Sequence, residues 1–254
     1  MALRGKPGTL KRSTMCTVSF LARKRGYVLA MNRDERLTRV VGLPPSKKSI
    51  NGITVVSPSE PGGGTWIALN DSGVAFTLIN WYSIRAQVKS KPVSRGEVVN
   101  AVCTAVTPEF VAVALAQLPL KQINPFRLIG IFPATQEITE WRWDFKKLTW
   151  KNHPWLARQW ISSGFDELGA QRIRHKTFLR ALKKKSAGTL DWLRRLHRSH
   201  APKPGPFATC MHRSDAATVS YSEVIVASHL ATMRHTISAP CQGSAIHAQS
   251  LKLN

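Results

Sequence analysis

A β-hairpin pattern near the start of the chain constrains the fold more than any other feature. Residues 16–21 alternate as a half-buried strand does, residues 24–26 (Lys-Arg-Gly) are typical of a tight turn, and residues 27–31 return as the partner strand. Hairpin geometry places the end of the second strand beside the start of the first. We therefore expect the polar run 32–35 (Asn-Arg-Asp-Glu) to lie close to the thiol of Cys16, which shares one strand face with Val18 and Phe20.

The rest of the chain predicts further strands, then helices, then strands. A second hairpin is predicted at residues 64–81, a helix with a capping-box start at 94–102, and a buried helix at 107–118 that begins with Thr-Pro-Glu. The remaining predicted segments are strands at 128–132 and 138–143, basic helical sequence at 166–200, and strands at 217–226 and 232–237. This order is typical of a single α+β domain, which we assign to residues 15–254.

Composition sets bounds on location and on metal chemistry. The chain has 254 residues, 43% of them hydrophobic, and its longest apolar stretch (98–120) is interrupted by polar residues, so no transmembrane segment is expected. The four cysteines are widely spaced without a CxxC pair, which favours a reducing, cytoplasmic compartment. Cys210 and His212 flank one residue, but we expect no matching pair of ligands nearby, and therefore no metal site and no cofactor.

The first fourteen residues decide whether Cys16 can be a chain terminus. Residues 1–14 are basic, contain no acid and lack the apolar core of a secretory signal. They are read either as a basic extension or as an upstream start codon wrongly chosen, and we favour the second. If translation begins at Met15 and this methionine is removed, Cys16 carries a thiol and a free α-amine on one residue. That pairing can hydrolyse amides with the amine as base.

The formal net charge of +23 predicts attraction to polyanions. Ten basic residues lie between positions 170 and 200: Arg172, Arg174, Lys176, Arg180, Lys183, Lys184, Lys185, Arg194, Arg195 and Arg198. The chain has no RNP or GXXG motif, and attraction to a phosphate backbone is non-specific by itself. We therefore expect no specific nucleic-acid partner, and a solvated basic face stays an alternative.

Several separated motifs resemble a known family. They occur in order: Met15-Cys16, the tetrad 32–35, Gly63-Gly64-Thr65-Trp66, Asn80 and Arg95-Gly96-Glu97. Together they resemble the NRDE-motif family, also called the Transport and Golgi Organisation family. The resemblance implies the αββα sandwich of the N-terminal nucleophile hydrolases and a similarity to cysteine amidases such as bile salt hydrolases and penicillin V acylases.

The same resemblance implies roles for individual residues. Cys16 would be the nucleophile and its α-amine, with a reference pKa of about 7.7–8.0, the base. Asp34 would orient that amine, Arg33 would favour the thiolate, and Asn80 would donate to the oxyanion.

Two further positions are weaker matches. Ser163 stands where relatives carry an asparagine, and a hydroxyl donates one hydrogen bond over a shorter reach. Arg213 approximates the C-terminal arginine of the amidases.

These residues leave two functions open. One is hydrolysis of a non-peptide linear amide, with an acyl-thioester on Cys16. The other is a non-catalytic carrier for a hydrophobic anionic ligand such as haem or an acyl-CoA, so the expected partner is a small-molecule substrate or ligand. Structural alternatives exist for each residue: Cys16 as an inert core cysteine, Arg33 with Asp34 as an ion pair, and Asn80 as a turn cap.

Overall fold

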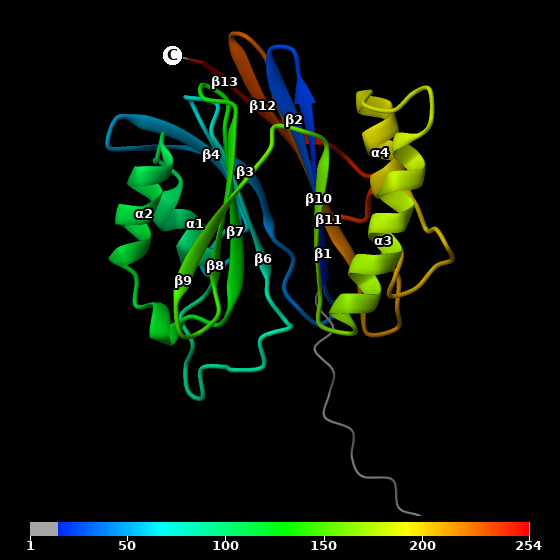
Figure 1. Cartoon of the computed structure of the whole chain (residues 1–254), viewed down its shortest axis with the longest axis horizontal. Helices are drawn as coiled ribbons and strands as arrows, with labels where there is room; N and C mark the ends of the chain where they lie inside the picture. The colour runs from blue at the N-terminus through cyan, green and yellow to red at the C-terminus, as the bar shows by residue number, and fades with distance from the viewer. Residues whose placement is uncertain (1–14, 254) are drawn as a thin grey trace, which may run out of the picture.

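The protein is a sandwich of two antiparallel β-sheets covered by helices on both outer faces (Figure 1). The computed structural model describes residues 15–253, so the basic extension predicted at 1–14 lies outside the described residues. Helices α1 and α2 lie on one side of the paired sheets, and α3 and α4 lie on the other. The predicted αββα architecture is confirmed.

Six strands form the first sheet, in the order β10-β1-β2-β11-β12-β13. Their bounds are β1 Met15–Arg23, β2 Gly26–Arg36, β10 Arg158–Ser163, β11 Ala216–Val226, β12 Leu230–Thr236 and β13 His247–Lys252. Seven strands form the second sheet in sequence order. Their bounds are β3 Leu43–Ile50, β4 Ile53–Ser59, β5 Ile67–Asn70, β6 Ala75–Asn80, β7 Phe126–Phe132, β8 Glu137–Trp143 and β9 Leu148–His153.

The helices divide between the two sheets. Those beside the second sheet are α1 (Gly96–Val102) and α2 (Pro108–Ala116), and those beside the first are α3 (Glu167–Leu182) and α4 (Leu190–Arg198). Short 3-10 turns are η1 (Leu120–Gln122) and η2 (Pro240–Gln242). Among the described residues, no helix is both long and apolar enough to cross a membrane.

The main core lies between the two sheets, and the first hairpin contributes one face of it. Cys16, Val18 and Phe20 are buried there, as their alternation predicts. Val28 and Ala30 point the opposite way and pack under α3 and α4. Each side chain of the hairpin therefore belongs either to the layer between the sheets or to the layer beneath the helices.

Two predictions about the helices are wrong. The segment 107–118 is not buried all round, because Phe110 and Val113 are 61% and 62% exposed while only one face of α2 packs inward. An outermost helix has a single partner layer, so its second face meets solvent whatever its sequence. The capping box at 94–97 does not form either, since Ser94 Oγ accepts from the N–H of Gly96 and the N-cap is Arg95.

The basic segment 166–200 is not one continuous cationic face. It divides into α3 and α4, and Arg174 is completely buried in α3. Arg194 donates two hydrogen bonds, of 2.9 and 2.8 Å, to the buried carboxylate of Glu223. These two cations are therefore committed to interior partners.

Candidate functional site

The register of the first hairpin distributes the Asn-Arg-Asp-Glu tetrad over two faces. Cys16 lies directly opposite Arg33, and Met15 lies opposite Asp34. Opposed residues of an antiparallel pair share a face, and successive residues alternate. Cys16 and Arg33 therefore point between the sheets, whereas Asp34 and Asn32 point toward the helices.

On the inner face, Arg33 is held by acidic and aromatic partners. Its Nη2 donates to Glu60 Oε1 at 2.6 Å and lies 3.5 Å from Glu35 Oε2. The guanidinium carbon lies 4.3 Å from the centre of a Trp66 ring. Arg39 shares the Glu60 carboxylate at 2.7 Å. These acidic partners thus offset much of the positive charge that Arg33 places near the sulfur of Cys16.

On the outer face, Asp34 is completely buried among hydrogen-bond donors. Thr218 Oγ1 donates to its Oδ1 at 2.6 Å, and Arg174 Nη2 lies 3.3 Å from its Oδ2. Arg174 also donates to the hydroxyl of Thr17. Burial raises the pKa of Asp34 to about 6, although Arg174 and Thr218 both oppose the shift. Arg174 is therefore a site residue that sequence reasoning had grouped with the basic surface.

Asn32, the first residue of the tetrad, is a structural clamp. Its Nδ2 donates to the carbonyl oxygens of His197 at 2.9 Å and Thr209 at 2.8 Å. Its Oδ1 lies 2.9 Å from His197 Nδ1. Burial, helped by the charge of Arg174, lowers the pKa of His197 to about 3, so the imidazole is neutral at ordinary pH. These bonds tie β2 to α4 and hold the site strand in place.

Cys16 and Asn80 line the same cavity of about 210 Å³ between the sheets. Arg33 and Asp34 also contribute to its wall, so the structure brings four of the six predicted site residues together. Asn80 Nδ2 donates to the hydroxyl of Tyr82 at 2.6 Å, which sets the orientation of the amide. Trp66 also lines the cavity, and its Nε1 is buried without a hydrogen-bond partner among the described residues.

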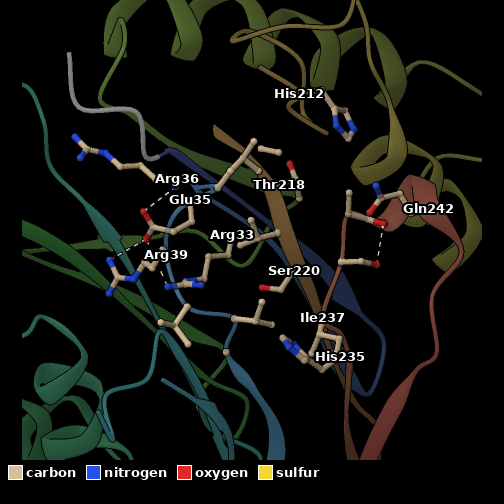
Figure 2. Close-up of a pocket in the computed structure, with 18 residues that line it drawn as sticks. Arg33, Glu35, Arg36, Arg39, His212, Thr218, Ser220, His235, Ile237 and Gln242 are labelled. Atoms are coloured by element: carbon tan, nitrogen blue, oxygen red, sulfur yellow. Dashed lines mark hydrogen bonds and ion pairs between the residues drawn. The ribbon is translucent and has the colours of Figure 1, made fainter. Parts of the chain in front are cut away.

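A second cavity of about 260 Å³ shares Arg33, Glu35 and Arg39 with the first. Figure 2 shows these three side chains on one side of it and His212 and Gln242 on the other. The shared residues make the two cavities neighbours, with the Arg33 ion pairs between them.

With Met15 attached, the thiol of Cys16 is not activated. Burial and the nearby charge of Asp34 raise its pKa to about 12, while a hydrogen bond from the Asp34 backbone and the charge of Arg33 lower it less. Met15 is completely buried in a cluster that includes Ile161 and Met211. The bond that precedes Cys16 therefore lies inside the first sheet.

Ser163 and Arg213 are not among the residues that line the Cys16 cavity. Ser163 lies opposite Met15 in the sheet, and its Oγ accepts from the N–H groups of Phe165 at 3.2 Å and Asp166 at 3.1 Å. Arg213 pairs with Asp215 at 2.8 Å and lies over the Phe165 ring at 4.8 Å. Their partners Phe165, Asp166 and Asp215 do not line that cavity either.

One expectation about ligand clusters is wrong. Cys210 and His212 do have a matching pair close by, because folding brings His200 and Cys241 to them. The pair could not be read from the sequence, since Cys241 lies far along the chain on η2.

One solved structure with a similar fold agrees with this architecture. A crystal structure of the C2A mutant of conjugated bile acid hydrolase from Clostridium perfringens superposes with a TM-score of 0.52 at 11% identity, covering 91% of this chain and 92% of that one. A penicillin V acylase from Agrobacterium tumefaciens gives a TM-score of 0.46 at 10% identity, with 94% and 92% covered. The first likeness shows the fold of an N-terminal nucleophile hydrolase.

In sequence, the chain has no significant match among curated proteins. A family match is nevertheless present over residues 15–142, half of the chain, and it includes the hairpin, the tetrad and Asn80. The chain therefore belongs to the family Transport and Golgi organisation 2.

Proposed function

We propose that this chain, when Cys16 is its first residue, hydrolyses linear amides other than peptides. The observation that carries the proposal is the shared cavity of Cys16 and Asn80, with Asp34 beside the strand end where the α-amine would lie. A nucleophile, an amide donor and a carboxylate behind the base are the groups that acyl transfer needs.

The reaction would follow from the chemistry of a terminal cysteine. The α-amine accepts the thiol proton, and the sulfur attacks the carbonyl carbon while Asn80 Nδ2 donates to the developing oxyanion. The carbon–nitrogen bond then breaks, and the leaving amine takes the proton back. Water hydrolyses the thioester and restores the thiol. The Asp34 carboxylate, once ionised, would stabilise the protonated amine.

Cavity size favours a small acyl group. Pockets for drug-sized ligands usually measure about 300–1,000 Å³, and the Cys16 cavity measures about 210 Å³. Trp66 and Leu78 give it apolar wall, and Arg33, Glu35 and Glu60 give it paired charges. We therefore infer a substrate with a short acyl portion.

Ligand binding without catalysis is the second candidate, and the high pKa of the Cys16 thiol favours it for a chain that retains Met15. Each cavity is small for haem, so a compact acyl ligand fits better. The four free cysteines support a reducing compartment such as the cytoplasm in either case.

The test compares two forms of the chain, one beginning at Cys16 and one beginning at Met15, each verified by intact mass. Both are incubated with a panel of short N-acyl amides, and released amine is measured. We expect turnover only in the form that begins at Cys16, abolished by Cys16→Ala and retained in the matched variant Cys103→Ala. Turnover that survives Cys16→Ala would show that the mechanism is wrong.

A further inference from the structure

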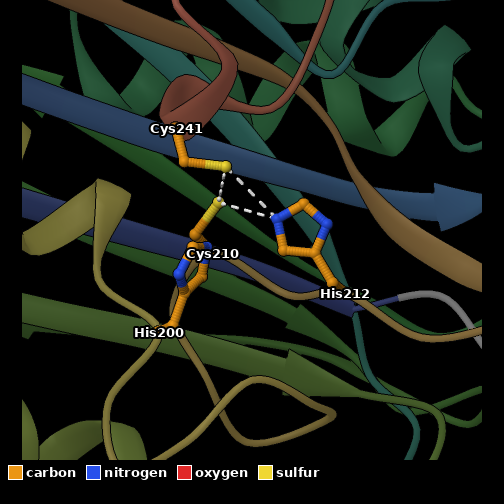
Figure 3. A group of neighbouring side chains, drawn as sticks. All are labelled: His200, Cys210, His212 and Cys241. Atoms are coloured by element: carbon orange, nitrogen blue, oxygen red, sulfur yellow. Dashed lines mark hydrogen bonds between the residues drawn. The ribbon is translucent and has the colours of Figure 1, made fainter.

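Four potential metal ligands converge at one end of the first sheet: His200, Cys210, His212 and Cys241. One donor atom from each lies within 4.8 Å of every other. The Sγ atoms of Cys210 and Cys241 are 3.5 Å apart, and His212 Nε2 lies 3.6 Å from the first and 3.3 Å from the second. Figure 3 shows Cys210 and His212, from the segment before β11, pointing toward Cys241 on η2.

These separations match a tetrahedral zinc complex. Zn–S bonds of about 2.3 Å and Zn–N bonds of about 2.0–2.1 Å place two sulfurs about 3.8 Å apart and a sulfur and a nitrogen about 3.5 Å apart. The three printed separations deviate from these values by a few tenths of an ångström. Three donors are therefore already spaced around a point that a zinc ion could occupy.

His200 is the fourth potential ligand, with a ring nitrogen within 4.8 Å of the other three donor atoms. Its ring packs edge-on against the ring of His212, with centroids 5.1 Å apart. Its Nε2 is buried and has no hydrogen-bond partner among the described residues. A buried imidazole nitrogen without a partner is costly unless something binds it. A metal ion would satisfy it.

We propose that His200, Cys210, His212 and Cys241 bind a zinc ion. Two thiolates and two imidazoles are a donor set that suits zinc, and four protein ligands leave no open position, so the site is structural rather than catalytic. On binding, each cysteine thiol releases its proton to solvent and the two imidazoles bind as neutral ligands. The site does not depend on the hydrolase chemistry proposed for Cys16.

The zinc site would cross-link three segments of the chain. His200 follows α4, Cys210 and His212 precede β11, and Cys241 lies on η2 between β12 and β13. The intervening Met211 exchanges two hydrogen bonds with Thr218, through its N–H at 2.8 Å and its carbonyl at 2.9 Å. Thr218 is the residue that donates to the Asp34 carboxylate. The metal would therefore hold the loop that supports Asp34.

The first measurement is the metal content of the full chain, purified without a polyhistidine tag and with its thiols reduced. Inductively coupled plasma mass spectrometry should find about one zinc ion per chain. Removing it and adding Co²⁺ should give the visible absorption of tetrahedral cobalt together with thiolate charge-transfer bands. The metal content of the variant Cys210→Ser/Cys241→Ser should be at least about tenfold lower than that of the unaltered chain. The metal content of Cys103→Ser should be unchanged.

Three results would overturn the proposal. The first is a chain that neither carries zinc nor yields the cobalt spectrum. The second is a metal content that is unchanged in Cys210→Ser/Cys241→Ser. The third is a Cys210–Cys241 disulfide in protein freshly isolated without reductant. If the double variant does not fold, Cys241→Ser alone replaces it, because this residue is exposed. The cobalt spectrum of the unaltered chain decides the question independently of any variant.

Discussion

Replacing Asp34 by asparagine should change how the stability of the protein depends on pH. Burial raises the pKa of this carboxyl from 3.8 to about 6, even though Arg174 and Thr218 act against the shift. The folded state therefore holds the proton more tightly than the unfolded chain does, so the free energy of unfolding falls as pH rises from about 4 to 6. A shift of about two pKa units corresponds to a loss of ~3 kcal/mol.

The assay is urea unfolding of the wild-type chain and of Asp34→Asn at several pH values between 4 and 7. We expect the variant to gain about 3 kcal/mol relative to wild type across this range. His197 and His235 titrate with the opposite sign, because burial lowers their pKa values to about 3 and about 4, but they contribute to both proteins and cancel in the difference.

A second variant tests the cause of the shift. Thr218→Val removes a hydrogen bond that lowers the pKa of Asp34, so the pH range over which stability falls should extend above 6.

Two results of the Asp34→Asn comparison would refute the reasoning. The first is a stability difference between wild type and Asp34→Asn that is constant from pH 4 to 7. The second is a free energy of unfolding that rises with pH in wild type relative to the variant, because the ion pair with Arg174 would then outweigh burial.

Three other substitutions, the first with a matched control, give separable outcomes. Arg174→Met should destabilise the fold by about 3–5 kcal/mol in urea unfolding, because it leaves Asp34 buried without its cation. The control is Lys176→Met, at an exposed position on the same helix, which should change stability by less than about 0.5 kcal/mol. Glu140→Gln should lower the free energy of unfolding by about 3 kcal/mol in the same assay, since this buried carboxylate accepts from two arginines and a histidine. A loss below about 1 kcal/mol would contradict the view that these ion pairs stabilise the fold. Asn80→Ala should lower kcat of the chain beginning at Cys16 by about 10²–10³, measured by amine release, and an unchanged kcat would remove Asn80 from the oxyanion role.

Local patterns predict the first hairpin well, because the alternation of apolar residues and the turn signal both lie within a few residues of one another in the sequence. The strands β1 and β2 form with the expected inward face. Edge strands were missed: β3 (Leu43–Ile50) and β9 (Leu148–His153) are largely exposed, so they lack the apolar alternation that marks a half-buried strand. Their pairing depends on neighbours rather than on their own residues.

The site was only partly predictable for a related reason. Cys16 and the tetrad meet through one hairpin, whereas Arg174 reaches Asp34 from 140 positions away. A signal for Arg174 was present, since it shares a helix face with Ala170 and Phe178, both buried. His200 and Cys241 carried no comparable signal, because their spacing from Cys210 fits no common zinc motif.

The most direct test of the account is the intact mass of the chain during one turnover with a short N-acyl amide, followed by peptide mapping of the modified residue. We expect an acyl group on Cys16 when this residue is the N-terminus, and none when Met15 precedes it. An acyl group on another residue, or equal turnover by both forms without a Cys16 adduct, would contradict it.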